Sequence, residues 1–235
     1  MTPTTPAAMA RTRQILEDLE AVRENLLALS DDIWLSIDHN NPQALDAGVE
    51  FKRAYNAKSA DFDVIANELS ELVQRYTSIR LEEAEESGGT DQDQNDRIIA
   101  ELNREEPHRL SENFTYKRPH GFILHEKGTT GITTRKRLYQ LVMQQLAERD
   151  LARLRSLCDH PDFTTTHGNT TFNSDPGRLR EVLQLGDQLY AESHFSANGI
   201  RDVIKRVLKA FEIPQDELQI FLRQDRDAGR LVDEP

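Results

Sequence analysis

Apolar residues recur at alternating steps of three and four through the stretch from Leu45 to Leu81. This series comprises Phe51, Tyr55, Phe62, Ile65, Leu69, Leu72, Tyr76 and Ile79, with Lys58 as an interruption. An upstream series has the same spacing at Ile15, Leu19, Val22, Leu26, Leu29 and Ile33. Such spacing places each series along one side of an α-helix that packs lengthwise against another helix. We therefore predict two long helices that meet along these two series.

The two helices are predicted to form an antiparallel hairpin over residues 11–81. The first starts near Pro6, and the second runs from Pro42 to about Glu86. Asn41 is a good N-cap for the second helix, and a proline fits the first turn that follows. The break between the helices is short, which makes them antiparallel.

The apolar stripe of this hairpin is wide and aromatic, which favours a third or fourth helix beside it. Self-association or docking of another helical protein would supply those helices. Alternatively, the hairpin folds onto the C-terminal part of its own chain. The predicted oligomer or partner interface consists of Leu19, Val22, Leu26, Leu29, Ile33, Phe62, Ile65, Leu69, Leu72 and Tyr76.

Residues 82–106 are predicted to form an acidic linker. Between Glu82 and Asp96 no apolar residue is larger than alanine, and every charge is negative, which predicts disorder. A short helix around 97–103 is predicted to dock onto the domain that follows. The remaining boundaries are a disordered lead-in at 1–10 and a polar tail at 223–235.

The segment 107–222 is predicted to be a small α+β domain, so the chain is α+β overall and mainly α. Pro119 interrupts a strand at 114–124 and restricts it to a sheet edge or a break. Thr133 or Thr134 is predicted to cap one helix, and Ser196 another. Other expectations are a β-hairpin at 162–172, a helical turn at 176–185, and strands at 188–195 and 218–222.

Charge is distributed unevenly between the two halves. Residues 1–106 carry 10 Lys and Arg against 23 Asp and Glu, whereas residues 107–235 carry 19 against 18. A protein that bound nucleic acid through net charge alone would be basic. The single cysteine, Cys158, excludes an internal disulfide and suits a reducing cytoplasm. The sequence contains no run of 18 apolar residues, so we predict no transmembrane helix.

Motifs for catalysis or cofactor binding are lacking in the sequence. The seven histidines show neither a His-x₃-His pair nor a Cys-x₂-Cys clip, and no metal site is predicted. Gly128 and Gly131 do not have the spacing of a P-loop, and no Gly-x-Ser-x-Gly motif is present. We therefore predict no cofactor and treat an enzyme as the minority hypothesis.

Basic residues cluster at three places in the C-terminal part. Arg201, Lys205 and Lys209 form one stripe at helical spacing. If the clusters converge, they could hold the phosphates of DNA or RNA; otherwise they are the ordinary solvated face of an amphipathic helix. The candidate nucleic-acid-binding residues are Lys117, Arg118, Arg135, Lys136, Arg137, Arg201, Lys205, Arg206 and Lys209.

Three segments resemble an uncharacterised bacterial domain found in restriction and phage-defence neighbourhoods. They are Phe114-Thr-Tyr-Lys-Arg-Pro-His-Gly-Phe, Phe172-Asn-Ser-Asp-Pro and Tyr190-Ala-Glu-Ser-His-Phe-Ser-Ala-Asn-Gly-Ile. The resemblance covers residues 110–222 and leaves the hairpin outside. It implies an accessory role in defence or regulation and brings no catalytic residue with it.

Together these observations predict a non-enzymatic, cytoplasmic bacterial protein. Its hairpin would mediate oligomerisation or docking, and its C-terminal domain would recognise a partner, possibly nucleic acid. One alternative is a pure protein–protein adaptor, in which the basic stripe is plain surface. A hydrolase or nuclease would instead need carboxylates or histidines gathered in one pocket.

Overall fold

The computed structural model describes residues 6–79, 87–88, 92–165 and 168–224. The chain forms two compact units, residues 1–84 and 85–235. The first is helical and the second combines helices with two small sheets, so the predicted α+β, mainly α class is confirmed. The disorder predicted at 1–10 and 82–96 is wrong where 6–10 are helical and 87–88 form a strand; residues 1–5, 82–86 and 89–91 and most of the polar tail lie outside the described residues.

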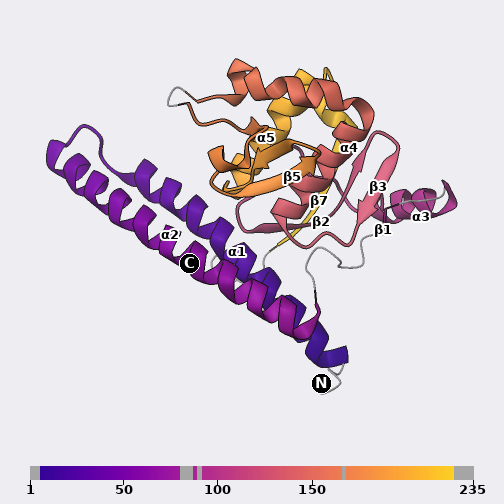
Figure 1. The fold of residues 1–235 in the computed structure, drawn as a ribbon, viewed down its shortest axis with the longest axis horizontal. Helices are drawn as coiled ribbons and strands as arrows, with labels where there is room; N and C mark the ends of the chain where they lie inside the picture. Colours follow the sequence, from indigo (N-terminus) through magenta and orange to yellow (C-terminus); the bar gives the residue numbers. More distant parts are fainter. Residues whose placement is uncertain (1–5, 80–86, 89–91, 166–167, 225–235) are drawn as a thin grey trace. The chain divides into compact units, whose positions relative to one another are not determined.

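The first unit is the predicted helical hairpin. Helices α1 (Pro6–Ser36) and α2 (Pro42–Thr77) run side by side in opposite directions (Figure 1). Asn41 caps α2, because its side-chain oxygen accepts hydrogen bonds from two amides of the first turn. The helix ends well before the predicted Glu86, since Ser78 adopts a left-handed conformation with φ of 58°.

Polar side chains connect α1 to α2. The guanidinium of Arg23 donates to Asp63 at 3.1 Å. Further along, the ammonium of Lys52 donates to the Ser30 carbonyl at 3.1 Å, and the Tyr55 hydroxyl donates to another α1 carbonyl at 2.8 Å. These contacts recur along both helices and fix how far one lies along the other.

Close approach of the helices near the turn depends on a glycine. A Cβ built at Gly48 would lie only 2.3 Å from Cδ1 of Ile37. The absent side chain therefore leaves space for Ile37, the residue that follows α1. In the same region the ring of Trp34 lies beside that of His39, with 5.4 Å between the centroids.

The prediction that the two apolar series meet between the helices fails for most of their members, although Tyr55 does contact α1. The α2 residues that contact α1 include Gly48, Lys52, Tyr55 and Asp63. Large apolar side chains such as Ile65 remain exposed. Small and hydrogen-bonding residues allow the helix axes to come close, so they take the inner positions.

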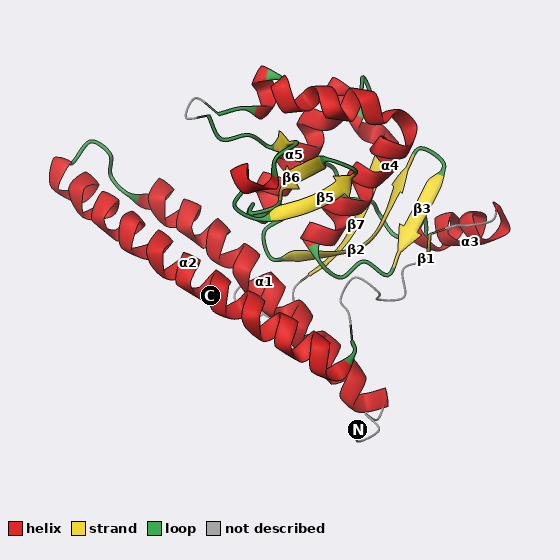
Figure 2. Ribbon diagram, in the orientation of Figure 1, coloured by secondary structure: helices red, strands yellow, loops and turns green. Residues whose placement is uncertain are grey.

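The second unit contains two antiparallel sheets (Figure 2). In the first sheet the strand order is β1-β3-β2-β7, and in the second it is β4-β6-β5. The strand bounds are β1 (Ser87–Gly88), β2 (Lys117–Leu124), β3 (Lys127–Thr130), β4 (Phe172–Asn173), β5 (Val182–Gly186), β6 (Leu189–Glu192) and β7 (Leu218–Gln224).

Two helices share one apolar core with both sheets. Helix α4 (Arg135–Ser156) contacts β2, β5 and α5 (Ala197–Ala210). As predicted, Thr134 caps α4 and Ser196 caps α5 through side-chain oxygens. The fully buried members of this core include Phe122, Leu138, Tyr139, Val142, Phe172, Leu189, Ile204, Val207 and Ile220.

Helix α3 (Gln92–Leu102) covers the opposite face of the first sheet. It begins at Gln92 rather than near Arg97, so part of the expected linker is helical. Its Ile98 and Leu102 pack with Ile123 and Phe221, which alternate with the main-core residues of β2 and β7. The helix approaches closest at Gly121, where an added Cβ would lie 2.6 Å from Leu102 and 2.9 Å from the Thr129 carbonyl.

Two strand predictions need correction. Strand β2 lies inside the sheet, between β3 and β7, so the edge alternative for Pro119 is wrong, whereas the predicted break is found as a register shift before Gly121. The predicted helical turn from Pro176 to Leu185 is wrong after its first residues. A short 3₁₀ turn at Pro176–Arg178 is followed by β5, whose alternating burial shows that one side of the strand packs on the core.

We expect Gly121→Ala to destabilise the second unit by about 1–3 kcal/mol, because the new methyl group meets a backbone carbonyl that cannot move aside. Chemical denaturation measures the change in the free energy of unfolding. Gly186→Ala is the matched control, since its Cβ would have ordinary contact with Leu151 at 3.8 Å. Equal stabilities of the two variants would contradict the close packing of α3.

Candidate functional site

The exposed side of the hairpin carries a broad apolar face. We define the apolar face as Ile15, Leu19, Val22, Leu26, Leu29 and Ile33 of α1 with Phe51, Phe62, Ile65, Leu69, Leu72 and Tyr76 of α2. Among these, Ile65 is 61% exposed, Leu72 54% and Tyr76 84%. The face contains the whole predicted interface, which the structure thus gathers on one surface.

The apolar residues of both helices face the same side of the hairpin, because on each helix they have the same angular offset from the residues that contact the other helix. On each helix an apolar residue immediately precedes one that contacts the other helix: Val22 precedes Arg23, and Phe62 precedes Asp63. One residue step turns an α-helix by about 100°. Since α1 and α2 are antiparallel, the same step in each chain direction leads to the same side of the hairpin. The two apolar series therefore form one continuous surface.

Charged side chains line the rim of this face. Arg11 and Arg75 lie near its open end, whereas Asp32 and Glu50 lie near its turn, and all four are exposed. Lys58 interrupts the α2 series and pairs with Asp61 at 3.0 Å. Exposed pairs of this kind add little stability, so Lys58 can exchange its partner at little cost.

Two of the predicted phosphate-binding arginines hold backbone carbonyls instead. Arg201 donates to the Glu112 carbonyl at 2.6 Å, and its side chain is 16% exposed. Arg135 is 2% exposed and donates to the Lys117 carbonyl at 2.7 Å. Both guanidiniums thus fasten the segment 112–117 to the helices behind it.

Other members of the basic set also contact protein atoms. Lys136 pairs with Glu181, and Arg206 donates to the Asp162 carbonyl at 2.7 Å and lies over the Phe163 ring. The remaining arginines, Arg118 and Arg137, are half-buried.

Lys205 and Lys209 differ from these residues. Neither ammonium has a hydrogen-bonding partner within the described part of the chain. The structure therefore does not gather the nine basic residues into one free patch, and these two lysines are the members best placed for an external phosphate.

Glu112 lies at the centre of a small polar network that the sequence reasoning missed. His108 Nδ1 lies 2.7 Å from its carboxylate, the Arg109 amide donates to it at 2.8 Å, and Lys117 lies 3.5 Å away. The hydrogen bond to His108, followed by the backbone amide and the nearby cations, lowers the pKa of Glu112 from 4.5 to about 2.

Asn198, in the first turn of α5, binds the same loop through its side chain. Its side-chain oxygen accepts from the Phe114 amide at 2.9 Å, and its amide group donates to Asn113 at 2.9 Å. Ser196 meanwhile accepts from the Gly199 amide as a helix cap. The Ser-Ala-Asn motif thus has a structural role at two of its residues.

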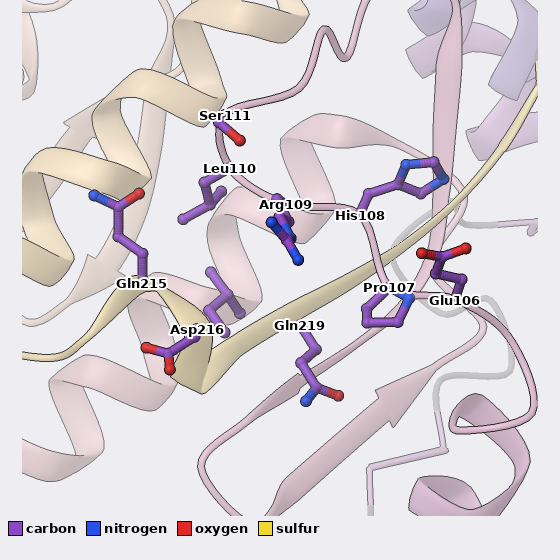
Figure 3. Close-up of a pocket in the computed structure, with 10 residues that line it drawn as sticks. Glu106, Pro107, His108, Arg109, Leu110, Ser111, Gln215, Asp216 and Gln219 are labelled. Carbon is purple, nitrogen blue, oxygen red and sulfur yellow. The ribbon is translucent and has the colours of Figure 1, made fainter.

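A surface hollow of about 650 Å³ lies between segment 106–111 and the start of β7 (Figure 3). Arg109 lies between Gln215 and Gln219 in this view, with Asp216 on the same wall. The lining of the hollow includes two carboxylates, Glu106 and Asp216, one arginine and His108, which is paired with Glu112.

The described histidines and Cys158 are not arranged as a metal site or an activated nucleophile. Four histidines each lie beside one carboxylate, in the pairs His108–Glu112, His120–Glu105, His125–Glu217 and His194–Glu181. Within the described residues no group of three potential ligands could hold a metal ion. Burial raises the pKa of the Cys158 thiol, which opposes thiolate formation.

Comparison with protein-family models, with curated proteins and with solved structures finds no match to this chain. A search of the described helices for a segment long and apolar enough to cross a bilayer also finds none.

We expect the network around Glu112 to make stability depend on acid. A carboxyl whose pKa is lowered on folding stabilises the fold at any pH above its unfolded value of 4.5, and this contribution is lost as the pH falls towards 2. Glu112→Gln should therefore lower the melting temperature at pH 7, and its difference from the unmodified protein should shrink below pH 4.5. Thermal melts from pH 7 to pH 2 measure it, and a constant difference would contradict the network.

Proposed function

We propose that this chain is a non-catalytic, cytoplasmic assembly protein that docks onto a helical protein surface through the apolar face of its hairpin. The observation that carries the proposal is the exposure of two apolar series on one side of the hairpin. Large contiguous apolar patches on a protein surface mark interaction sites. Helical partners suit this one, because the residues recur at the spacing of a helix that packs lengthwise.

The composition of the contact between α1 and α2 supports the same proposal. The hairpin is connected by Arg23–Asp63, by Lys52 and by Tyr55. Many of its large aliphatic residues, among them Ile65 and Leu72, remain exposed. Keeping such residues in water costs about 1.5–3 kcal/mol each relative to burying them, which a docked partner would recover.

The C-terminal domain would recognise a second partner. Its basic residues are mostly engaged with protein atoms, which favours a protein as that partner. Nucleic acid is the second candidate, and Lys205 and Lys209 are the residues that favour it. A role in bacterial defence or regulation is proposed from the sequence resemblance alone.

We expect Ile65→Glu with Leu72→Glu to abolish docking, because two carboxylates would be buried in an apolar interface. Each change at the centre of an interface costs about 2 kcal/mol or more, so affinity should fall at least about a hundredfold. Cross-linking of the tagged full chain in its host cells, followed by recovery, measures what remains attached, second copies included.

The matched control is Val64→Glu with Leu35→Glu. Both residues are as exposed as those changed, at 57% and 75%, and neither belongs to the apolar series: Leu35 lies on the far side of α1, and Val64 lies one residue from Ile65, outside the face. The proposal requires that attached proteins are lost from the first variant and kept by the control. Loss from both, or from neither, would refute it.

Lys205→Ala with Lys209→Ala tests the nucleic-acid candidate. If these lysines contact phosphates, binding of the full chain to DNA or RNA should weaken with salt, and the slope of log affinity against log salt should fall by about two units in the variant. Fluorescence anisotropy across a salt series measures this slope. Absence of binding at low salt would leave the protein-recognition candidate.

A further inference from the structure

We propose that the partner on the apolar face is a second copy of this chain, whose hairpin packs in the opposite direction to form a four-helix bundle. This inference rests on the proposed function and names its partner. The area of the face, its internal register and the charges on its rim support it.

The face has the area that a stable dimer needs. About 30 residues at 1.5 Å each give a length of about 45 Å, and two adjacent helices are about 20 Å wide. The product, on the order of 900 Å², matches the roughly 800 Å² that each partner contributes to a specific interface. One further hairpin covers such a face completely, whereas a single helix would cover half of it.

The apolar residues are self-complementary about a two-fold axis. The hydrogen bond from Arg23 to Asp63 places Val22 and Phe62 at the same level of the hairpin. If the axis passes there, Val22 and Phe62 each meet their own copy. Ile15 then lies across from Leu29 of the second copy, because both are seven residues from Val22.

The same axis matches apolar residues on α2. Tyr55 and Leu69 are each seven residues from Phe62, so the axis places them at the same level, with Tyr55 at the inner edge of the face, where its hydroxyl also donates to an α1 carbonyl. Seven residues are about two helical turns, so these residues also share a side of the helix. A two-fold interface requires this relation, in which one surface is complementary to itself.

The rim charges favour the antiparallel arrangement over the parallel one. An axis near Phe62 brings Arg75 of one copy beside Glu50 of the other, and Arg11 beside Asp32. It also brings Lys58 towards Glu68. A parallel arrangement would instead place the arginines of the two open ends together, and like charges repel.

The test uses the full chain of 235 residues. Sedimentation equilibrium should give twice the chain mass at micromolar concentration, and Ile65→Glu with Leu72→Glu should give the monomer while Val64→Glu with Leu35→Glu stays dimeric. A monomeric unmodified chain at 100 µM would overturn the inference. If the apolar face still captured another protein in cells, the proposed function would stand without it.

Orientation is measured with one spin label in the turn. Asn40→Cys in a Cys158→Ser background places a single nitroxide at an exposed position. Antiparallel hairpins separate the two labels by about 36 residue rises, or about 50 Å, whereas parallel hairpins bring them within about 20 Å. Pulsed electron paramagnetic resonance distinguishes the two, and the short distance would overturn the proposed arrangement.

A charge exchange provides the second check. Glu50→Lys should raise the dissociation constant of the dimer roughly tenfold, because two attractive pairs become repulsive. Adding Arg75→Glu reverses both members of the pair and should restore the constant to within about threefold. Restoration is expected only if the two residues face each other across the interface, and a further loss would overturn the pairing.

Discussion

The hairpin depends on how α2 divides its residues between two neighbouring rows. The row that contacts α1 contains Gly48 and hydrogen-bonding residues such as Lys52, so the helices come close and still satisfy their polar groups. The large aliphatic residues lie one position before these contact residues in each repeat. Because a single step turns the helix by about 100°, they face outward on both helices together. One phase relation thus produces both a self-sufficient hairpin and its apolar face.

In the C-terminal unit, arginine side chains stabilise the fold by binding backbone carbonyls. Arg135 and Arg201 reach the segment 112–117 from two different helices, and each donates to a backbone carbonyl of that segment. Asn198 binds the same segment through its side-chain amide. A loop without regular structure of its own is in this way held by charged and polar side chains, whose backbone partners no sequence pattern could reveal.

Sequence spacing was sufficient to predict the hairpin, its turn at Asn41 and the caps at Thr134 and Ser196, because these features depend on residues near one another in the chain. Spacing was insufficient to predict which row faces inward. Leu69 and Ser70 each belong to a row of residues at helical spacing. Hydrophobicity alone favours the row of Leu69 as the one that faces inward. The inner row combines a glycine with side chains that hydrogen-bond to the other helix, and these partners become visible only when the helices are placed together.

The candidate site shows the same division between local and long-range information. The residues of the apolar face were all predicted, although their orientation was not. The network at Glu112 was missed, since Lys117 and Arg201 reach it through the folded chain. A histidine four residues before the glutamate, at His108, was the local signal that could have indicated it.

The single tryptophan of the chain, Trp34, lies on α1 beside His39, close to the turn of the hairpin. Its fluorescence therefore originates entirely in the first unit and is independent of the aromatic residues of the second. A change in its emission therefore reports an event in the hairpin. The circular dichroism of the sheets, in contrast, comes from the C-terminal domain. The protein thus carries an intrinsic optical label that separates the behaviour of one unit from that of the other.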